Sequence, residues 1–128
     1  MGKGEPLEIV ETTQGGVAIL EVRGRINSTT AESLQERLCA AARGGHAGVV
    51  VDLKQVAYIS SAGFRALLLG ARAGSNSGSG LALCGVAGEI QRLFDIAGFD
   101  GAFEMFPTRE ECIARLKASA QAGTPKSP

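Results

Sequence analysis

The chain has 128 residues, 45% of them hydrophobic and 20% charged, which is typical of one compact domain that buries its own core. Thirteen basic and thirteen acidic residues cancel and no Lys/Arg block occurs, so we expect neither nucleic acid nor a membrane surface as a partner. No apolar run reaches membrane-spanning length and residues 1–6 lack an apolar signal region, which predicts a cytoplasmic protein.

The first third of the chain predicts two antiparallel strands and a helix. Residues 7–13 and 17–24 are strand-like, and the Gln-Gly-Gly sequence between them suits a hairpin loop. Residues 24–28 predict a turn, after which Thr29 and Glu32 have the spacing of a capping box. The following helix ends at a Gly-Gly pair, and its apolar face contains Ala31, Leu34, Leu38, Ala41 and Ala42.

The middle of the chain predicts a buried strand and a second helix. Residues 48–53 are a continuous, largely β-branched run, the pattern of a central parallel strand that is covered on both faces. The segment Tyr58–Gly63 then contains two adjacent serines and leads into a helix with Phe64, Leu67, Leu68 and Ala71 at helical spacing. Residues 74–80 contain only Gly, Ser and Asn, which predicts a mobile surface loop.

The last third continues the alternation of strands and helices. Residues 81–84 and 103–106 predict short strands, and Thr108 with Glu111 predicts a second capping box before a final helix. Residues 118–128 predict a frayed helix end or a disordered tail, so we expect one domain over residues 1–117. The helix between the two short strands has an apolar stripe that stops at Gly98 and contains Ile90, Leu93, Phe94 and Ala97.

This order of elements predicts an α/β fold with a mixed sheet. An antiparallel hairpin opens the sheet, and helices and strands then alternate, with about four helices in all. In such sheets, sites form where strands end and helices begin. The turns at residues 24–28 and 60–63 are both of this kind.

Three cysteines, Cys39, Cys84 and Cys112, lie far apart in apolar segments without the paired spacing of metal ligands. We therefore predict reduced core cysteines, with no metal site and no cofactor.

The serines at residues 60 and 61 offer the main candidate chemistry. A serine at a helix start can cap the helix, bind an anion or carry a phosphate, and capping is the commonest of these roles. A nucleophilic serine at this kind of turn requires a glycine two residues earlier, where Ile59 stands before Ser61. The single histidine, His46, is expected at the opposite edge of the sheet in a solvated loop, so we predict no catalytic residues and no enzyme.

Four segments resemble, in order and spacing, the STAS domain of bacterial anti-sigma factor antagonists. They are residues 24–27 (Gly-Arg-Ile-Asn), 49–53 (Val-Val-Val-Asp-Leu), 58–63 (Tyr-Ile-Ser-Ser-Ala-Gly) and 90–98, within a match over about residues 7–116. The resemblance implies a partner-switching protein whose unphosphorylated form binds a serine-kinase anti-sigma factor and so releases the sigma factor. Phosphorylation by the kinase blocks this binding, and a serine phosphatase reverses it.

The resemblance also assigns residues. Ser61 matches the phosphoacceptor serine, and Gly63 matches the glycine of the following turn. Ser60 stands where the family commonly has aspartate, and Asn27 stands at another acidic position, so both departures remove negative charge and Ser60 becomes an alternative acceptor. The residues expected to bind a partner are Asn27, Ser60, Ser61, Gly63, Phe64 and Arg65.

Some roles stay open from the sequence. Phe64 suits the core or a partner contact equally well, Arg65 is either a solvated helix charge or a phosphate partner, and Asn27 is chiefly a turn residue. As an alternative function, a STAS module can act as a nucleotide or anion sensor, or as a structural subunit, without phosphorylation. In that case Asn27, Ser60 and Ser61 supply the polar groups. We expect a monomer or a weak dimer.

Overall fold

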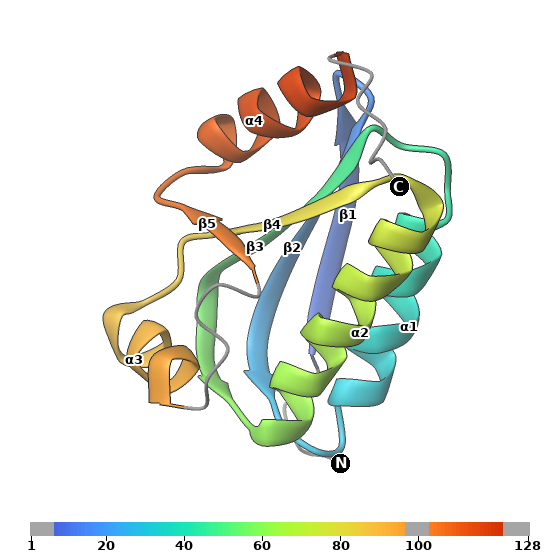
Figure 1. Cartoon of the computed structure of the whole chain (residues 1–128). Coiled ribbons are helices and arrows are strands. Elements are labelled where there is room, and N and C mark those ends of the chain that lie inside the picture. The colour runs from blue at the N-terminus through green and yellow to red at the C-terminus, as the bar shows by residue number, and fades with distance from the viewer. Residues whose placement is uncertain (1–6, 97–102, 122–128) are drawn as a thin grey trace.

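The computed structural model describes residues 7–96 and 103–121, and within them a five-stranded sheet is flanked by four helices (Figure 1). Strands lie side by side in the order β1-β2-β3-β4-β5; β1 pairs antiparallel with β2, and every other pairing is parallel. The mixed α/β fold opened by a hairpin is therefore confirmed. The elements are β1 (Glu8–Gln14), β2 (Val17–Ile26), α1 (Ala31–Ala42), β3 (Gly48–Ile59), α2 (Ser61–Ser77), β4 (Gly80–Cys84), α3 (Gly88–Ile96), β5 (Glu104–Phe106) and α4 (Arg109–Gln121).

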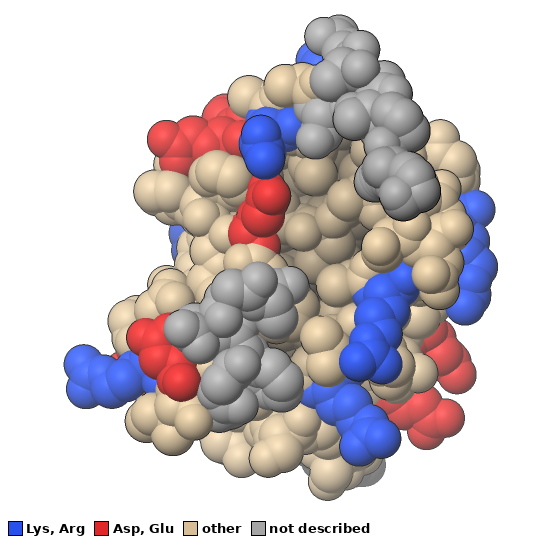
Figure 2. All heavy atoms as spheres, in the orientation of Figure 1, with Lys and Arg blue, Asp and Glu red and all other residues tan. Residues whose placement is uncertain are grey.

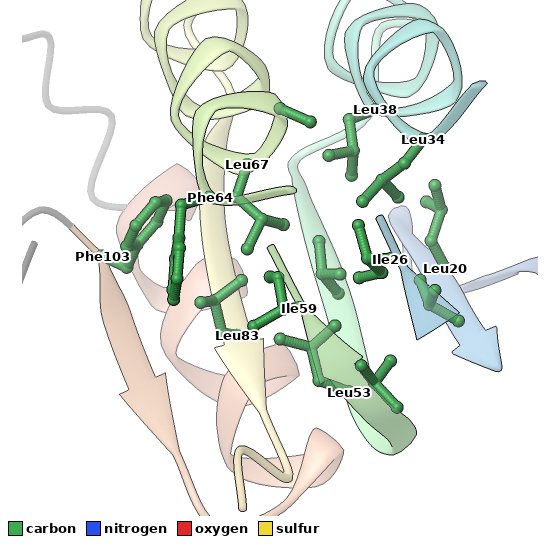
Figure 3. Close-up of a cluster of buried hydrophobic side chains, with 14 of the residues drawn as sticks. Leu20, Ile26, Leu34, Leu38, Leu53, Ile59, Phe64, Leu67, Leu83 and Phe103 are labelled. Atoms are coloured by element: carbon green, nitrogen blue, oxygen red, sulfur yellow. The ribbon is translucent and has the colours of Figure 1, made fainter. Parts of the chain in front are cut away.

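The main core lies between the sheet and the helices α1 and α2. Strand β3 is central, and its residues 48–53 are all buried, as expected for a strand covered on both faces. Three aromatic rings extend this core towards α3: the Phe64 and Phe94 centroids are 4.6 Å apart, and Phe94 and Phe103 are 5.5 Å apart, both edge to face. The larger side chains labelled in Figure 3 show how strands and helices contribute together: Leu20, Ile26, Leu34, Leu38, Leu53, Ile59, Phe64, Leu67, Leu83 and Phe103.

Helix α4 packs against the opposite face of the sheet and encloses a second apolar cluster (Figure 1). Cys84 and Cys112 are both buried there, as predicted for core residues, whereas Cys39 is half-buried. The Cys112 thiol donates to the Leu83 carbonyl at 3.4 Å. Its hydrogen bond with Cys84, together with burial, raises the pKa of Cys112, so this thiol stays protonated at neutral pH.

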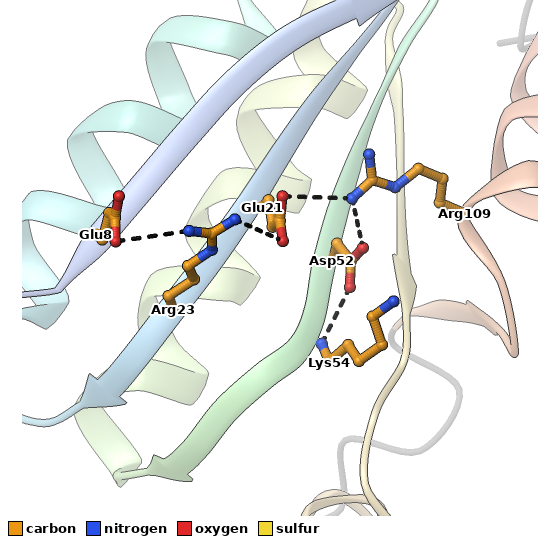
Figure 4. A network of polar contacts seen from close by, with 6 residues as sticks. All are labelled: Glu8, Glu21, Arg23, Asp52, Lys54 and Arg109. Atoms are coloured by element: carbon orange, nitrogen blue, oxygen red, sulfur yellow. Dashed lines mark hydrogen bonds and ion pairs between the residues drawn. The ribbon is translucent and has the colours of Figure 1, made fainter.

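A chain of ion pairs ties the start of α4 to the strands (Figure 4). The buried Asp52 carboxylate lies 2.8 Å from the Arg109 guanidinium and also accepts the Lys54 backbone N–H at 3.0 Å. Arg109 reaches Glu21 at 3.6 Å, and Arg23 continues the chain from Glu21 at 3.3 Å. Because Asp52 is 3% exposed, loss of these partners would leave a buried carboxylate uncompensated.

The first strand-to-helix turn differs from its prediction. Strand β2 continues to Ile26 instead of stopping at residue 24, because Gly24 has a φ of 113° at a register shift and bends the strand without ending it. The prediction of a capping box between Thr29 and Glu32 is wrong, since Thr30 is the N-cap residue of α1 and makes no side-chain cap hydrogen bond. The turn therefore lies at residues 27–30.

The prediction of a flexible loop at residues 74–80 is also wrong. Helix α2 continues through Ser77, Gly78 ends it with a φ of 79°, and β4 starts at Gly80. The small residues here permit close packing: a Cβ on Gly74 would lie 2.5 Å from the Ser79 carbonyl oxygen. Ser79 itself is buried, and its hydroxyl donates to the carbonyl of half-buried His46 at 3.2 Å.

Two predictions in the last third are partly confirmed. In α3, Ile90 and Phe94 are buried but Leu93 is 42% exposed, and the predicted end of the stripe at residues 97–98 lies outside the described residues. The Thr108 hydroxyl accepts the Glu111 N–H at 3.2 Å, which is one half of a capping box. Helix α4 continues to Gln121, and residues 122–128 also lie outside the described part, so the domain boundary at residue 117 stays a prediction.

Candidate functional site

Two strand-to-helix turns lie beside each other where β2 and β3 end. Ile26 and Ile59, the last residues of these strands, are paired in the parallel register, and the Ser60 N–H donates to the Ile26 carbonyl at 2.8 Å. Asn27 and Ser60 therefore follow directly from one edge of the sheet. Both turns thus lie at the carboxyl ends of neighbouring parallel strands, where sites form in sheets of this kind.

Gly63 sets how closely α2 approaches this edge. A Cβ at this position would lie 2.6 Å from Cγ2 of Ile26 and 2.7 Å from Cγ1 of Ile59, both buried side chains. Real Cβ atoms do not come this close to other carbons, so only glycine fits here without movement. The helix start, with Ser60 and Ser61, is thus seated directly on the ends of β2 and β3.

The two serines have different surroundings. Ser60 is the N-cap residue of α2, half-buried, and its hydroxyl oxygen accepts the Gly63 N–H at 3.3 Å. Ser61 is the first residue of the helix and is exposed, and none of the hydrogen bonds within the described residues uses its hydroxyl. The neighbouring helix dipole also favours negative charge at this position.

Asn27 acts as a turn residue, as predicted. Its side-chain oxygen accepts the N–H groups of Thr29 and Thr30 at 2.9 and 3.0 Å, and the Thr30 hydroxyl in turn accepts the Asn27 N–H at 2.9 Å. An aspartate could accept the same two bonds, so asparagine keeps the shape of the turn without the charge. Asn27 remains half-buried beside the Ser60 turn.

The other predicted site residues divide between core and surface. Gly63 is buried, and Phe64 is 6% exposed with its ring against Phe94. Both residues therefore help to position α2 on the core. Arg65 is exposed one helical turn after Ser61. Of the six predicted residues, Ser61 and Arg65 are the most accessible, while Asn27 and Ser60 are half-buried.

The sequence prediction missed one feature of this edge. The Arg25 guanidinium lies over the Tyr58 ring, 4.5 Å from its centroid, and Tyr58 is 40% exposed. The sequence pattern places Arg25 in a turn at residues 24–28, whereas Arg25 is a strand residue paired with Tyr58 in the register of β2 and β3. The signal in the sequence is Gly24, because a glycine inside a strand pattern can mark a bulge. A strand that continues past this bulge brings Arg25 beside Tyr58.

Asn27 Oδ1 and Ser60 Oγ each accept backbone N–H groups of their own turn, and these bonds hold the two side chains in place. Within residues 7–96 and 103–121, no group of three or more His, Cys, Asp or Glu side chains could hold a metal ion. In the same part of the chain, no helix is long and apolar enough to cross a bilayer.

Comparison with protein families identifies one match that spans most of the chain. The family model described as STAS domain matches residues 8–112. A curated relative, BtrV of Bordetella bronchiseptica, has a provisional assignment as an anti-sigma factor antagonist. It is 36% identical over 104 residues, which cover 81% of this chain and 90% of BtrV.

Solved structures share the fold at lower sequence identity. An anti-sigma factor antagonist from Mycobacterium paratuberculosis has a TM-score of 0.77 at 20% identity, with 91% of this chain and 99% of that chain covered. The Bacillus cell fate determinant SpoIIAA in its phosphorylated form has a TM-score of 0.64 at 15% identity, with 86% and 98% covered. These similarities establish the fold over most of both chains.

Proposed function

Because the chain belongs to the STAS domain family, we propose that it is an anti-sigma factor antagonist that changes partners when Ser61 is phosphorylated. The unphosphorylated form binds a serine-kinase anti-sigma factor in the cytoplasm, as a monomer or weak dimer, and so releases the sigma factor. The kinase then phosphorylates Ser61, and the complex between the two proteins dissociates. A serine phosphatase removes the phosphate and restores binding.

The observation that carries this proposal is the contrast between the two serines. Ser60 caps α2 through Gly63, whereas Ser61 presents a free, exposed hydroxyl at the positive end of the helix dipole. A kinase needs an accessible hydroxyl, and capping occupies the other one. Ser61 is therefore the preferred acceptor and Ser60 the alternative.

The phosphoryl transfer requires no catalytic group from this chain. The Ser61 oxygen attacks the γ-phosphorus of ATP bound to the kinase, the bond to the β-phosphate oxygen breaks, and ADP leaves. The hydroxyl proton passes to a base on the kinase. This chain contributes only the position of the nucleophile.

The switch follows from the charge that phosphorylation adds, about −1.5 to −2 at neutral pH. At an exposed helix start, the dipole stabilises this charge by roughly 0.3–1 kcal/mol, so the fold is retained. Within a partner interface, an uncompensated or opposed charge costs several kcal/mol, which exceeds that local gain. Phosphorylation therefore releases the partner without unfolding the domain.

Intact-mass analysis after incubation with ATP and the serine-kinase anti-sigma factor of the same organism tests the acceptor. We expect wild type and Ser60→Ala to gain one phosphoryl group and Ser61→Ala to gain none. If Ser61→Ala is modified while Ser60→Ala is not, Ser60 is the acceptor and the assignment fails. Absence of modification in the wild type contradicts the phosphorylation switch itself.

A further inference from the structure

Helix α2 has positive side chains and no acidic ones. Its seventeen residues, Ser61–Ser77, include Arg65 and Arg72 but no Asp or Glu. These arginines are seven positions apart, which is two helical turns, so they project from the same face. Both are exposed.

Arg65 and Arg72 have no carboxylate partner within residues 7–96 and 103–121, and the same holds there for Arg25, Arg43 and Arg92. In contrast, four other arginines lie within 4.0 Å of a carboxylate oxygen: Arg23, Arg37, Arg109 and Arg115. An unpaired cation in water adds little to stability. Arg65 and Arg72 thus remain available for a partner.

The same helix face contains an apolar residue and the candidate acceptor. Ser61, Arg65, Leu68 and Arg72 follow at intervals of four, three and four, and we call this set the α2 stripe. Leu68 is half-buried against the core, so part of its side chain stays accessible. Figure 2 shows Lys and Arg side chains over α2 on the face turned to the viewer, and side chains of both charges to one side, over α1.

We propose that the α2 stripe is a docking surface for an acidic segment of the anti-sigma factor kinase, a proposal that rests on the function above. Carboxylates of that segment pair with Arg65 and Arg72 while an apolar side chain covers Leu68. Glu32 and Glu36 are exposed on the neighbouring α1. They repel an acidic segment from α1 and so fix its lateral position on α2.

An acidic partner also explains why phosphate on Ser61 is disruptive. The phosphate lies one helical turn from Arg65 and competes with the partner carboxylates for that guanidinium. It also places its own negative charge opposite those carboxylates. Recognition and release therefore use the same electrostatic surface.

Titration calorimetry with the serine-kinase anti-sigma factor of the same organism tests this surface. We expect Arg65→Glu and Arg72→Glu each to weaken binding by about tenfold or more, and the neutral Arg65→Gln and Arg72→Gln to weaken it less. Lys117→Glu is the matched control, because Lys117 is also an exposed cation without an ion pair in the described residues but lies on α4, across the sheet from α2. It should bind like the wild type, and the double Gln variant should depend less on salt.

The outcomes separate this proposal from the function it rests on. If wild type binds the kinase and releases it on phosphorylation, but the four α2 variants bind as tightly as wild type, the α2 stripe is not the docking surface. If Lys117→Glu weakens binding as much as Arg65→Glu, only net charge matters and the proposal is wrong. If the unphosphorylated wild type does not bind the kinase, the proposed function fails and this surface fails with it. Circular dichroism and urea unfolding establish that each variant is folded.

Discussion

Replacing Gly63 with alanine tests whether close packing positions the candidate acceptor. The new Cβ would lie 2.6 Å from Cγ2 of Ile26 and 2.7 Å from Cγ1 of Ile59, and both isoleucines are at most 3% exposed. Overpacking of a buried site costs about 1–3 kcal/mol, and two contacts at these distances favour the upper part of that range. Alanine regains about 1 kcal/mol through its higher helix propensity, so we expect a net loss of about 1–2 kcal/mol.

Urea unfolding of Gly63→Ala beside Gly88→Ala measures this cost. Gly88 is also helical, but a Cβ there meets no atom within 4 Å, so its variant should be as stable as wild type or slightly more stable. Because the isoleucines are held in the core, the strain should displace the first turn of α2 and slow phosphorylation of Ser61. A Gly63→Ala protein with wild-type stability and phosphorylation rate would refute the claim that this contact positions the site.

Two further predictions compare matched residues by urea unfolding. Ser60→Ala should lose about 0.5–2 kcal/mol because Ser60 caps α2, while Ser61→Ala should stay within about 0.5 kcal/mol of wild type; equal losses would contradict the division of roles. Arg109→Met should lose about 2–4 kcal/mol because it leaves the Asp52 carboxylate buried without its cation, whereas Arg115→Met, which breaks an exposed pair, should lose at most about 1 kcal/mol. Similar losses for the two arginine variants would show that burial of Asp52 does not strengthen its pair.

The sequence predicted the architecture because most strands and helices carry clear hydrophobic periodicity. The β-branched run at residues 48–53 identified the central strand, and the Gly-Gly pair after Gln14 identified the hairpin. Polar residues between such runs then predicted the site at the strand ends. The order and type of the elements, and the end of the sheet at which the candidate site lies, can be predicted from local patterns alone.

Predictions failed where a contact far along the chain overrides the local pattern. Residues 74–80 have the composition of a flexible loop, yet the Ser79 hydroxyl donates to the carbonyl of His46, 33 residues away, and α2 continues to Ser77. Gly24 suggests the end of a strand, yet pairing with β3 carries β2 on to Ile26. Small residues permit both flexible loops and tight packing, and the sequence does not distinguish them.

The sequence names Ser60 and Ser61 as candidate residues but does not say which role each one has. Two adjacent serines before a helix leave open which one caps it, and the geometry assigns the cap to Ser60. The spacing of Arg109 from Asp52 in the sequence likewise gives no sign of their ion pair, which depends on how α4 packs against the sheet. Side-chain roles of this kind require the tertiary structure.

The central claim is that negative charge on Ser61 breaks the complex with the anti-sigma factor kinase. The most direct measurement is the affinity of that kinase for the unphosphorylated protein, for the protein phosphorylated at Ser61, and for the Ser61→Asp and Ser61→Asn variants. The account predicts that the phosphorylated protein and Ser61→Asp lose binding while Ser61→Asn, of nearly the same shape without the charge, retains most of it. A folded phosphorylated protein that binds with wild-type affinity would contradict the account.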